Sequence, residues 1–486
     1  MHAEYDFRRR PAINTGSNIK LQDKPVNPVL TAVLVAVCAL ELLARVTGAQ
    51  PVQDLACAFM LVVIVLAARR LSLREIYLIC ASLVLSILVI WSLPNPGTIL
   101  RGALEQGAFL MSFILLLSLL QATAARSPSV ATVGAFLTQR PTGQRYLALS
   151  GGVSLLAVLF NIGVVSFLVP LIQNGIRKAT PDDPLNPIRE RRQLSALLRG
   201  FAWSVTWSPT AFAPLIVADL MPGVQRGTWI GYGLVLFSIL LFFGWLEDRL
   251  RFRHYRPKGV RPVMDFPVRA ALLFVATTLW FLALVLLVIW AFEESVVFGV
   301  LAACPLMVAG WLLAQEDGPP ARAIRALPRQ LARLVATNLP DSVNVAITLA
   351  ASGFVGRAAA SLVPATEVAE AMGLAHFPDW VLLATMPTAL AVISLLALSP
   401  TMLAVFMGSF FAALPELPAD ATLIAFSISC GWALSMTFSP FATVVLIIAR
   451  GSGIPAHVLT LRWNLGFTLI ATALLFPIFF LMTGGQ

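Results

Sequence analysis

Charge is what this sequence has least of. Only 12% of its 486 residues are Asp, Glu, Lys or Arg, whereas 58% are apolar. A water-soluble globular chain of this length needs more charge on its surface, so the composition excludes that class of protein. Many apolar runs approach the roughly 20 residues that a helix needs to cross a bilayer. We therefore predict an all-α polytopic membrane protein.

Residues that support metal or redox chemistry are also scarce. The cysteines lie in apolar runs without paired spacing, as small core residues do, and the histidines lie outside the expected spans. These residues are Cys38, Cys57, Cys80, Cys304 and Cys430, and His2, His254, His376 and His457. The sequence has no Walker-type phosphate loop and no His-Glu-x-x-His motif. We expect no cofactor, no metal site, no ATP-driven step and no enzymatic activity.

One polar phrase occurs twice in the middle of long apolar stretches. Ser204-Val-Thr-Trp-Ser-Pro-Thr-Ala is repeated as Ser435-Met-Thr-Phe-Ser-Pro-Phe-Ala, 231 residues later. A Ser-Pro pair should interrupt a membrane helix, and a break at mid-membrane is tolerated only inside protein or beside a wet cavity. Matching breaks in two halves of a chain indicate the binding site of a transporter.

The positive charges predict the topology. We expect spans over 28–47, 52–67, 76–94, 104–122, 195–221, 229–246, 270–292, 295–314, 338–358, 421–449 and 464–482. Basic residues flank 147–174 on both sides and acidic residues flank 380–413, so each stretch should form a re-entrant hairpin that returns to its own face. Only four of the 34 lysines and arginines are then outside. The net charge of +10 therefore reflects the positive-inside rule and not nucleic-acid binding.

This arrangement of about 11 spans and two hairpins makes an inverted-topology repeat. Residues 1–103 form a cytoplasmic tail and scaffold helices. The first repeat, 104–246, contains the inner hairpin 147–174 and the broken helix 195–221. Basic connectors and scaffold helices occupy 247–337. The second repeat, 338–486, contains the outer hairpin 380–413 and the broken helix 421–449.

Four points near the bilayer midplane favour the start of a half-helix. Serine before proline, or asparagine, can cap the first free N–H groups, and each helix start carries partial positive charge. We expect these starts to bind an anion. The candidate substrate-binding residues are Asn161, Ile162, Gly163, Ser208, Pro209, Ser399, Pro400, Thr401, Ser439 and Pro440.

A coupling cation has its own candidates. Thr206, Thr437, Asn161 and Ser399, together with carbonyls at half-helix ends, could coordinate Na⁺. Asp341 begins a polar face with Asn344, Thr348 and Ser352 down one span, and is a candidate for proton or cation coupling; a carboxylate that merely reaches the aqueous interface explains it equally well.

The order of span, polar-tipped hairpin and broken span, repeated in inverted form, resembles the ion transporter superfamily, which includes divalent anion/sodium symporters and arsenite exporters. The hairpin tips there carry Ser-Asn-Thr, of which Asn161 and Ser399-Pro400-Thr401 keep part. The broken spans have Trp207-Ser208-Pro209 and Phe438-Ser439-Pro440 where the family has Gly-Thr-Pro. The resemblance implies a secondary transporter with a dimeric scaffold and an elevator-like transport domain.

The favoured function is secondary transport of a small organic or inorganic anion, with coupling to Na⁺ or H⁺ left open. The chain should lie in the inner membrane, surrounded by lipid, with its N-terminus cytoplasmic and its C-terminus outside. A channel, or the membrane subunit of a binding-protein-dependent transporter, fits the broken helices nearly as well. An integral membrane enzyme fits less well, because no catalytic constellation is found.

Overall fold

The computed structural model describes residues 27–179, 183–255, 265–293, 295–315 and 319–485. Within these ranges every regular element is a helix, and twelve helical segments are long and apolar enough to cross a membrane. The prediction of a polytopic all-α membrane protein is therefore confirmed. A helix suits this setting because it satisfies its own backbone groups where hydrocarbon cannot.

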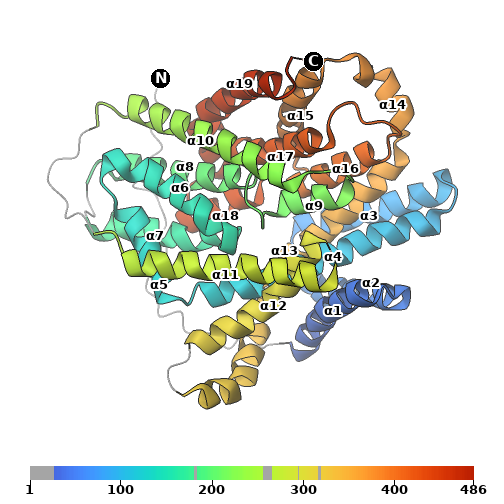
Figure 1. Cartoon of the computed structure of the whole chain (residues 1–486), viewed down its shortest axis with the longest axis horizontal. Coiled ribbons are helices and arrows are strands. Elements are labelled where there is room, and N and C mark those ends of the chain that lie inside the picture. The colour runs from blue at the N-terminus through green and yellow to red at the C-terminus, as the bar shows by residue number, and fades with distance from the viewer. Residues whose placement is uncertain (1–26, 180–182, 256–264, 294, 316–318, 486) are drawn as a thin grey trace.

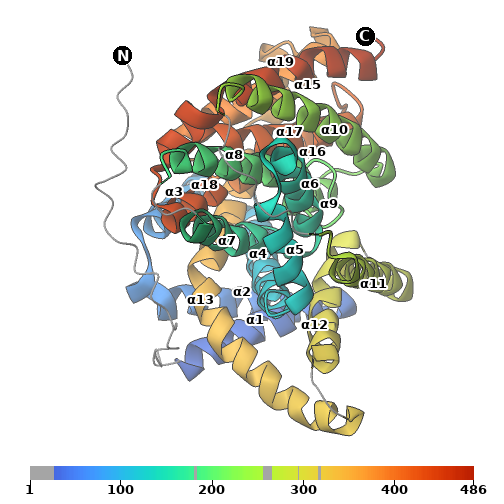
Figure 2. The ribbon, with the colours of Figure 1, turned by 90° about the vertical axis from the view of Figure 1, so that its left-hand side faces the viewer.

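One part of the molecule is built from helices that lie far apart in the sequence. It contains α1 (Pro28–Thr47), α2 (Gln50–Ala67), α4 (Pro96–Ala124), α12 (Val296–Gln315) and α13 (Pro320–Leu362). These helices lie together in both views, with α3 (Leu73–Ser92) beside α13 and α11 (Val268–Phe292) beside α12 (Figures 1 and 2). α4 and α13, the first helices of the two predicted repeats, pack along each other.

The other part contains two helical hairpins. In the first, α6 (Thr142–Phe160) and α7 (Gly163–Ala179) meet at Asn161 and Ile162, and α5 (Pro128–Gln139) precedes them. In the second, α15 (Asp379–Ile393) and the short turn η4 (Ser394–Leu396) lead to α16 (Pro400–Ala412). The apolar parts of the return limbs, Gly163–Ile176 and Pro400–Ala412, are shorter than 18 residues. A helix of that length is less than about 27 Å long and does not span about 30 Å of hydrocarbon.

Two broken helices accompany the hairpins. α8 (Asn186–Ser204) is separated from α9 (Phe212–Leu220), and α17 (Ala421–Phe438) from α18 (Thr443–Ser452). The start of the broken span expected over 195–221 needs correction, because its first helix begins at Asn186; it ends at Ser204, where the duplicated phrase predicted the break. Buried ion pairs explain the polar start of α8: Arg192 pairs with Asp248 at 2.6 Å and Arg199 with Glu247 at 2.9 Å. Protein side chains, and not lipid, surround this helix.

The packing of these elements follows a two-fold pattern. α6 packs on α8 as α15 packs on α17, and α7 packs on α18 as α16 packs on α9. The remaining elements are α10 (Arg226–Arg251), α14 (Ala365–Ala371), η3 (Leu374–His376), the π-helical segment η5 (Val458–Asn464) and α19 (Leu465–Met482). α10 covers α6, and α19 covers α15. α9 of the first half thus contacts the second hairpin through α16, and α18 of the second half contacts the first hairpin through α7.

The basic end of the 247–337 region was expected to be a connector separate from the span 338–358. From residue 320 it is instead continuous with the first span of the second half, as the 43-residue helix α13. Its end projects from the body of the molecule (Figure 2). Arg322, Arg325, Arg329 and Arg333 are exposed there.

Candidate functional site

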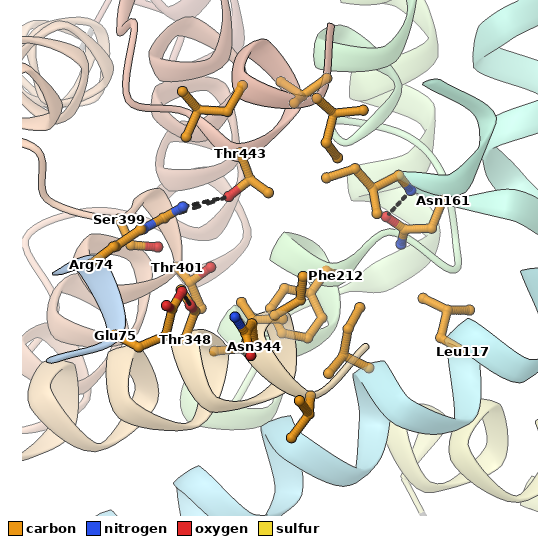
Figure 3. A pocket seen from close by; sticks show the side chains of 18 of the residues that line it. Arg74, Glu75, Leu117, Asn161, Phe212, Asn344, Thr348, Ser399, Thr401 and Thr443 are labelled. Atoms are coloured by element: carbon orange, nitrogen blue, oxygen red, sulfur yellow. Dashed lines mark hydrogen bonds between the residues drawn. The ribbon is translucent and has the colours of Figure 1, made fainter. Parts of the chain in front are cut away.

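The hairpin tips and the second halves of the broken helices surround one cavity of about 900 Å³. The first hairpin contributes Asn161 and Ile162, and the second contributes Ser399, Pro400 and Thr401. Phe212 and Ala213 of α9 and Thr443 and Val444 of α18 complete this group of helix ends. Asn161 lies across the cavity from Ser399 and Thr443 (Figure 3). Five of the predicted substrate-binding residues therefore meet at one site.

The half-helices begin at other residues than the sequence indicated. Ser208 and Ser439 were expected to cap α9 and α18, but those helices follow Ala211 and Ala442, neither of which makes a side-chain capping bond. Ser399 does precede α16, with Pro400 in the first turn, although its hydroxyl makes no capping bond. The first N–H groups of α9 and α18 are thus left without a side-chain cap at the cavity.

Asn161 has an unusual backbone. It ends α6, and its φ of 45° and ψ of −133° lie in a region that side chains other than glycine rarely adopt. Its Oδ1 accepts the N–H of Ile162 at 2.8 Å, and its Nδ2 lies 3.5 Å from the Thr210 carbonyl. The side chain therefore joins the hairpin tip to the first break.

The serines of the duplicated phrase lie behind the cavity wall. Ser439 donates to the Ser394 carbonyl at 2.9 Å. Ser208 lies 3.3 Å from the hydroxyl of Thr210, which donates to the Val158 carbonyl. The predicted residues that do not line the cavity are Gly163, Ser208, Pro209, Ser439 and Pro440. The hydroxyls of Thr210 and Ser439 tie each break to the first limb of the hairpin beside it.

The two candidate threonines for a cation are fully buried and lie outside the 900 Å³ cavity. Thr206 donates to the Trp203 carbonyl at 2.8 Å and borders a second, mainly apolar cavity of about 280 Å³. Thr437 donates to the Leu434 carbonyl at 3.1 Å and accepts a hydrogen bond from Thr468 at 3.0 Å. Thr206 is therefore engaged within its own break, whereas Thr437 also bonds α19.

The polar face of α13 does reach the cavity. Asp341, Asn344 and Thr348 all line it, whereas Ser352 is buried elsewhere without a hydrogen-bond partner. Asn344 donates to the Arg70 carbonyl at 2.9 Å, and Thr348 donates to Glu75 at 3.0 Å. These bonds join α13 to the start of α3. Asp341 is exposed at the edge of the cavity.

Three arginines in the lining were not singled out in the sequence. Arg70 precedes α3, Arg74 lies in its first turn, and Arg450 lies in the last turn of α18. In the part of the chain that the structure describes, none of the three is ion-paired. The lining carries three guanidinium groups against the two carboxylates of Glu75 and Asp341. The sequence showed these arginines only as charges that set topology.

Aromatic and aliphatic side chains form the rest of the lining. Phe212 and Trp432 meet edge to face, with ring centroids 5.9 Å apart. Ile114, Leu117 and Phe201 also border the space. Leu117 lies on the side opposite Arg74, and Phe212 lies between them (Figure 3). The cavity lining thus combines basic and hydroxyl-bearing side chains with apolar ones.

No family model matches this sequence, and no curated protein matches it either. The solved structures that resemble this chain include two transporters. The YdaH transporter of Alcanivorax borkumensis is 16% identical, with 85% of this chain and 99% of that chain covered and a TM-score of 0.48. MtrF of Neisseria gonorrhoeae is described as one of a class of antimetabolite efflux pumps. It is 14% identical, with 84% of this chain and 95% of that chain covered and a TM-score of 0.46. Neither comparison names the ion transporter superfamily, so that resemblance stays a prediction.

Proposed function

We propose that this chain is a secondary transporter that carries a small organic anion through the 900 Å³ cavity. The observation that carries the proposal is the meeting of four helix starts and three arginines at one cavity. Helix starts offer N–H donors and partial positive charge, and arginine suits carboxylate and phosphate groups. An organic cation would meet repulsion from the same groups.

The proposed substrate has an apolar body as well as an anionic group. The cavity lies near the upper end of the volumes that hold small-molecule ligands, about 300–1,000 Å³. Its lining includes the apolar side chains of Leu117, Phe212 and Trp432, which an inorganic anion would leave without an apolar partner. An aromatic or aliphatic carboxylate suits both the charged and the apolar parts of the lining.

In the proposed topology the cavity faces the cytoplasm, because Arg70, Asp341 and Arg450 lie at predicted cytoplasmic ends. The hairpins and broken helices would move as an elevator against a scaffold of α4 and α13, and this scaffold would form the dimer.

Re-entrant hairpins predict that both ends of each hairpin are labelled from the same side of the membrane. In a cysteine-free background, cysteines at 144 and 178 should react only from the cytoplasm, and those at 378 and 416 only from outside. Labelling of either pair from opposite faces would contradict the re-entrant hairpins and, with them, the inverted-repeat topology.

Uptake into proteoliposomes tests the function. Full-length protein should accumulate at least one organic anion with saturable kinetics, and should not accumulate organic cations or neutral solutes of similar size. A Na⁺ gradient and a pH gradient are applied separately to identify the coupling ion. Single-channel conductance without saturation would instead indicate a channel, and uptake of cations alone would refute the anion proposal.

Asp341 is the proposed coupling carboxylate. It is exposed at the cavity edge on the same helix face as Asn344 and Thr348. Asp341→Asn keeps the size and polarity of the side chain and removes its charge. The substitution should abolish the response to one of the two gradients while exchange of anion for anion continues. If transport by the variant still responds to both gradients, Asp341 is only a solvated residue near a helix end and has no role in coupling.

A further inference from the structure

Arg74 is a half-buried arginine with a weak partner. Its Nη1 and Nη2 lie 3.4 and 3.5 Å from the hydroxyl of Thr443, and Figure 3 shows the side chain reaching toward that residue. Typical N–H···O hydrogen bonds measure 2.7–3.2 Å, so these two contacts are long, and their acceptor is uncharged. A guanidinium offers five donors in a planar fork, which a single hydroxyl does not match.

The neighbouring carboxylate, Glu75, makes no ion-pair contact with Arg74. Glu75 accepts from the backbone N–H of Ser72 at 2.7 Å and from the hydroxyl of Thr348 at 3.0 Å. These bonds turn the carboxylate toward the start of α3 and toward α13. No described carboxylate forms an ion pair with the Arg74 guanidinium.

The other side of the contact also suits an anion. Thr443 is the first residue of α18, which follows Ala442 without a side-chain cap. Thr443 and Val444 both line the cavity. A group held between Arg74 and this helix start would meet a full positive charge on one side and N–H donors on the other.

We propose that Arg74 binds the anionic group of the substrate and that the anion displaces the Thr443 hydroxyl from it. The proposal rests on the proposed function and names the residue that selects for the charge. A carboxylate or sulfonate accepts two parallel bonds from the guanidinium, and such charge-assisted bonds are roughly twice as strong as neutral ones. The Thr443 hydroxyl occupies part of the place that the anion takes.

Arg74 and Thr443 belong to different parts of the molecule, so replacing their contact by an anion changes how those parts are joined. α3 packs along α13, whereas Thr443 belongs to a broken helix in the other part of the molecule. The Arg74–Thr443 contact therefore joins the two parts directly. An anion on Arg74 ends the direct tie to α18, so occupancy of the site and contact between the two parts are linked.

Binding to purified full-length protein in detergent tests the proposal. Benzoate, hexanoate, glutarate and benzenesulfonate serve as probes, with benzyl alcohol as the neutral control, and Kd is measured by calorimetry. Arg74→Gln should raise the Kd of the bound anion about ten- to a hundredfold, since a bond to a charged group is lost. Arg74→Lys, which keeps the charge without the fork, should give an intermediate Kd. Thr443→Val should lower the Kd about two- to fivefold, because it removes the competing hydroxyl.

The two substitutions should change Kd in opposite directions, and this difference distinguishes anion binding from a structural role of the contact. Arg329→Gln on the exposed end of α13 is the matched control and should leave Kd unchanged. Equal increases in Kd for Arg74→Gln and Thr443→Val would mean that their contact only supports the fold, and would overturn the proposal. So would an Arg74→Gln protein that binds within threefold of the wild type. If the wild type binds no anion, the proposed function fails instead.

Discussion

The two copies of the Ser-x-Thr-x-Ser-Pro phrase differ in backbone geometry although their sequences match. In the first copy the helix ends at Ser204, and seven residues, 205–211, pass before α9 begins. In the second copy the helix continues through Phe438, and only the four residues 439–442 are non-helical. Local sequence therefore specifies that each helix breaks, whereas the surroundings decide where it unwinds.

The helices that cover the two breaks explain the difference. At the first break α10 presents Gly233, where an added Cβ would lie 2.1 Å from the Thr206 carbonyl oxygen. At the second break α19 presents Thr468, which bonds the hydroxyl of Thr437. The first break is thus in close backbone contact with its neighbour, and the second is held through side chains.

The breaks agree in how they hold the hairpins. A hydroxyl from each break donates to a carbonyl near the end of the first hairpin limb, from Thr210 to Val158 and from Ser439 to Ser394. The donor comes two residues after Ser208 in the first copy and from the matching serine in the second. The following predictions test this comparison.

The largest effect is expected at the close contact of the first break. Gly233→Ala should force α10 away from the backbone of Thr206 and Trp207 and lower the free energy of unfolding by about 3 kcal/mol. Gly231→Ala lies in the same helix with open space around it and is the matched control. It should be neutral or stabilising by up to about 1 kcal/mol. The melting temperatures of the two purified variants test this prediction. Equal values would show that α10 can move away from the first break without loss of stability.

A smaller effect is expected where the breaks hold the hairpins. Thr210→Val and Ser439→Ala each leave a buried carbonyl without this donor and should cost about 1–3 kcal/mol. Ser208→Ala, which loses only the contact to Thr210, should cost no more than about 1 kcal/mol. Unfolding of the three proteins is compared under the same detergent conditions. A Ser208 variant as unstable as the Ser439 variant would mean that the two serines play the same role after all.

The smallest effect is expected at the cover of the second break. Thr468→Val removes the bond to Thr437 but keeps the size of the side chain, so it should cost about 0.5–1.5 kcal/mol. Thr483→Val near the end of α19, whose hydroxyl bonds only its own helix, is the control and should change stability less. A loss as large as that of Gly233→Ala would show that the second break depends on its neighbour as strongly as the first does.

Several parts of the site followed from the sequence. The Ser-Pro and Asn signals located both hairpin tips at the cavity, because capping residues and proline act within one helical turn. The spacing of Asp341, Asn344 and Thr348 located the cavity-facing side of α13, because residues three and four apart share one helix face. The re-entrant orientation and the inverted repeat remain predictions from charge.

Only the tertiary structure decided which groups face the cavity. Arg74 reaches the cavity because α3 packs along α13, and Phe212 and Trp432 meet because α9 packs beside α17. These pairings join residues far apart in the chain, so no local pattern encodes them. By itself, the sequence determined a helical membrane protein with two broken helices and two polar hairpin tips, since hydropathy and capping are local properties. The unwinding of each break, the hydroxyl that holds each hairpin and the arginine that faces the cavity depend on packing between distant segments.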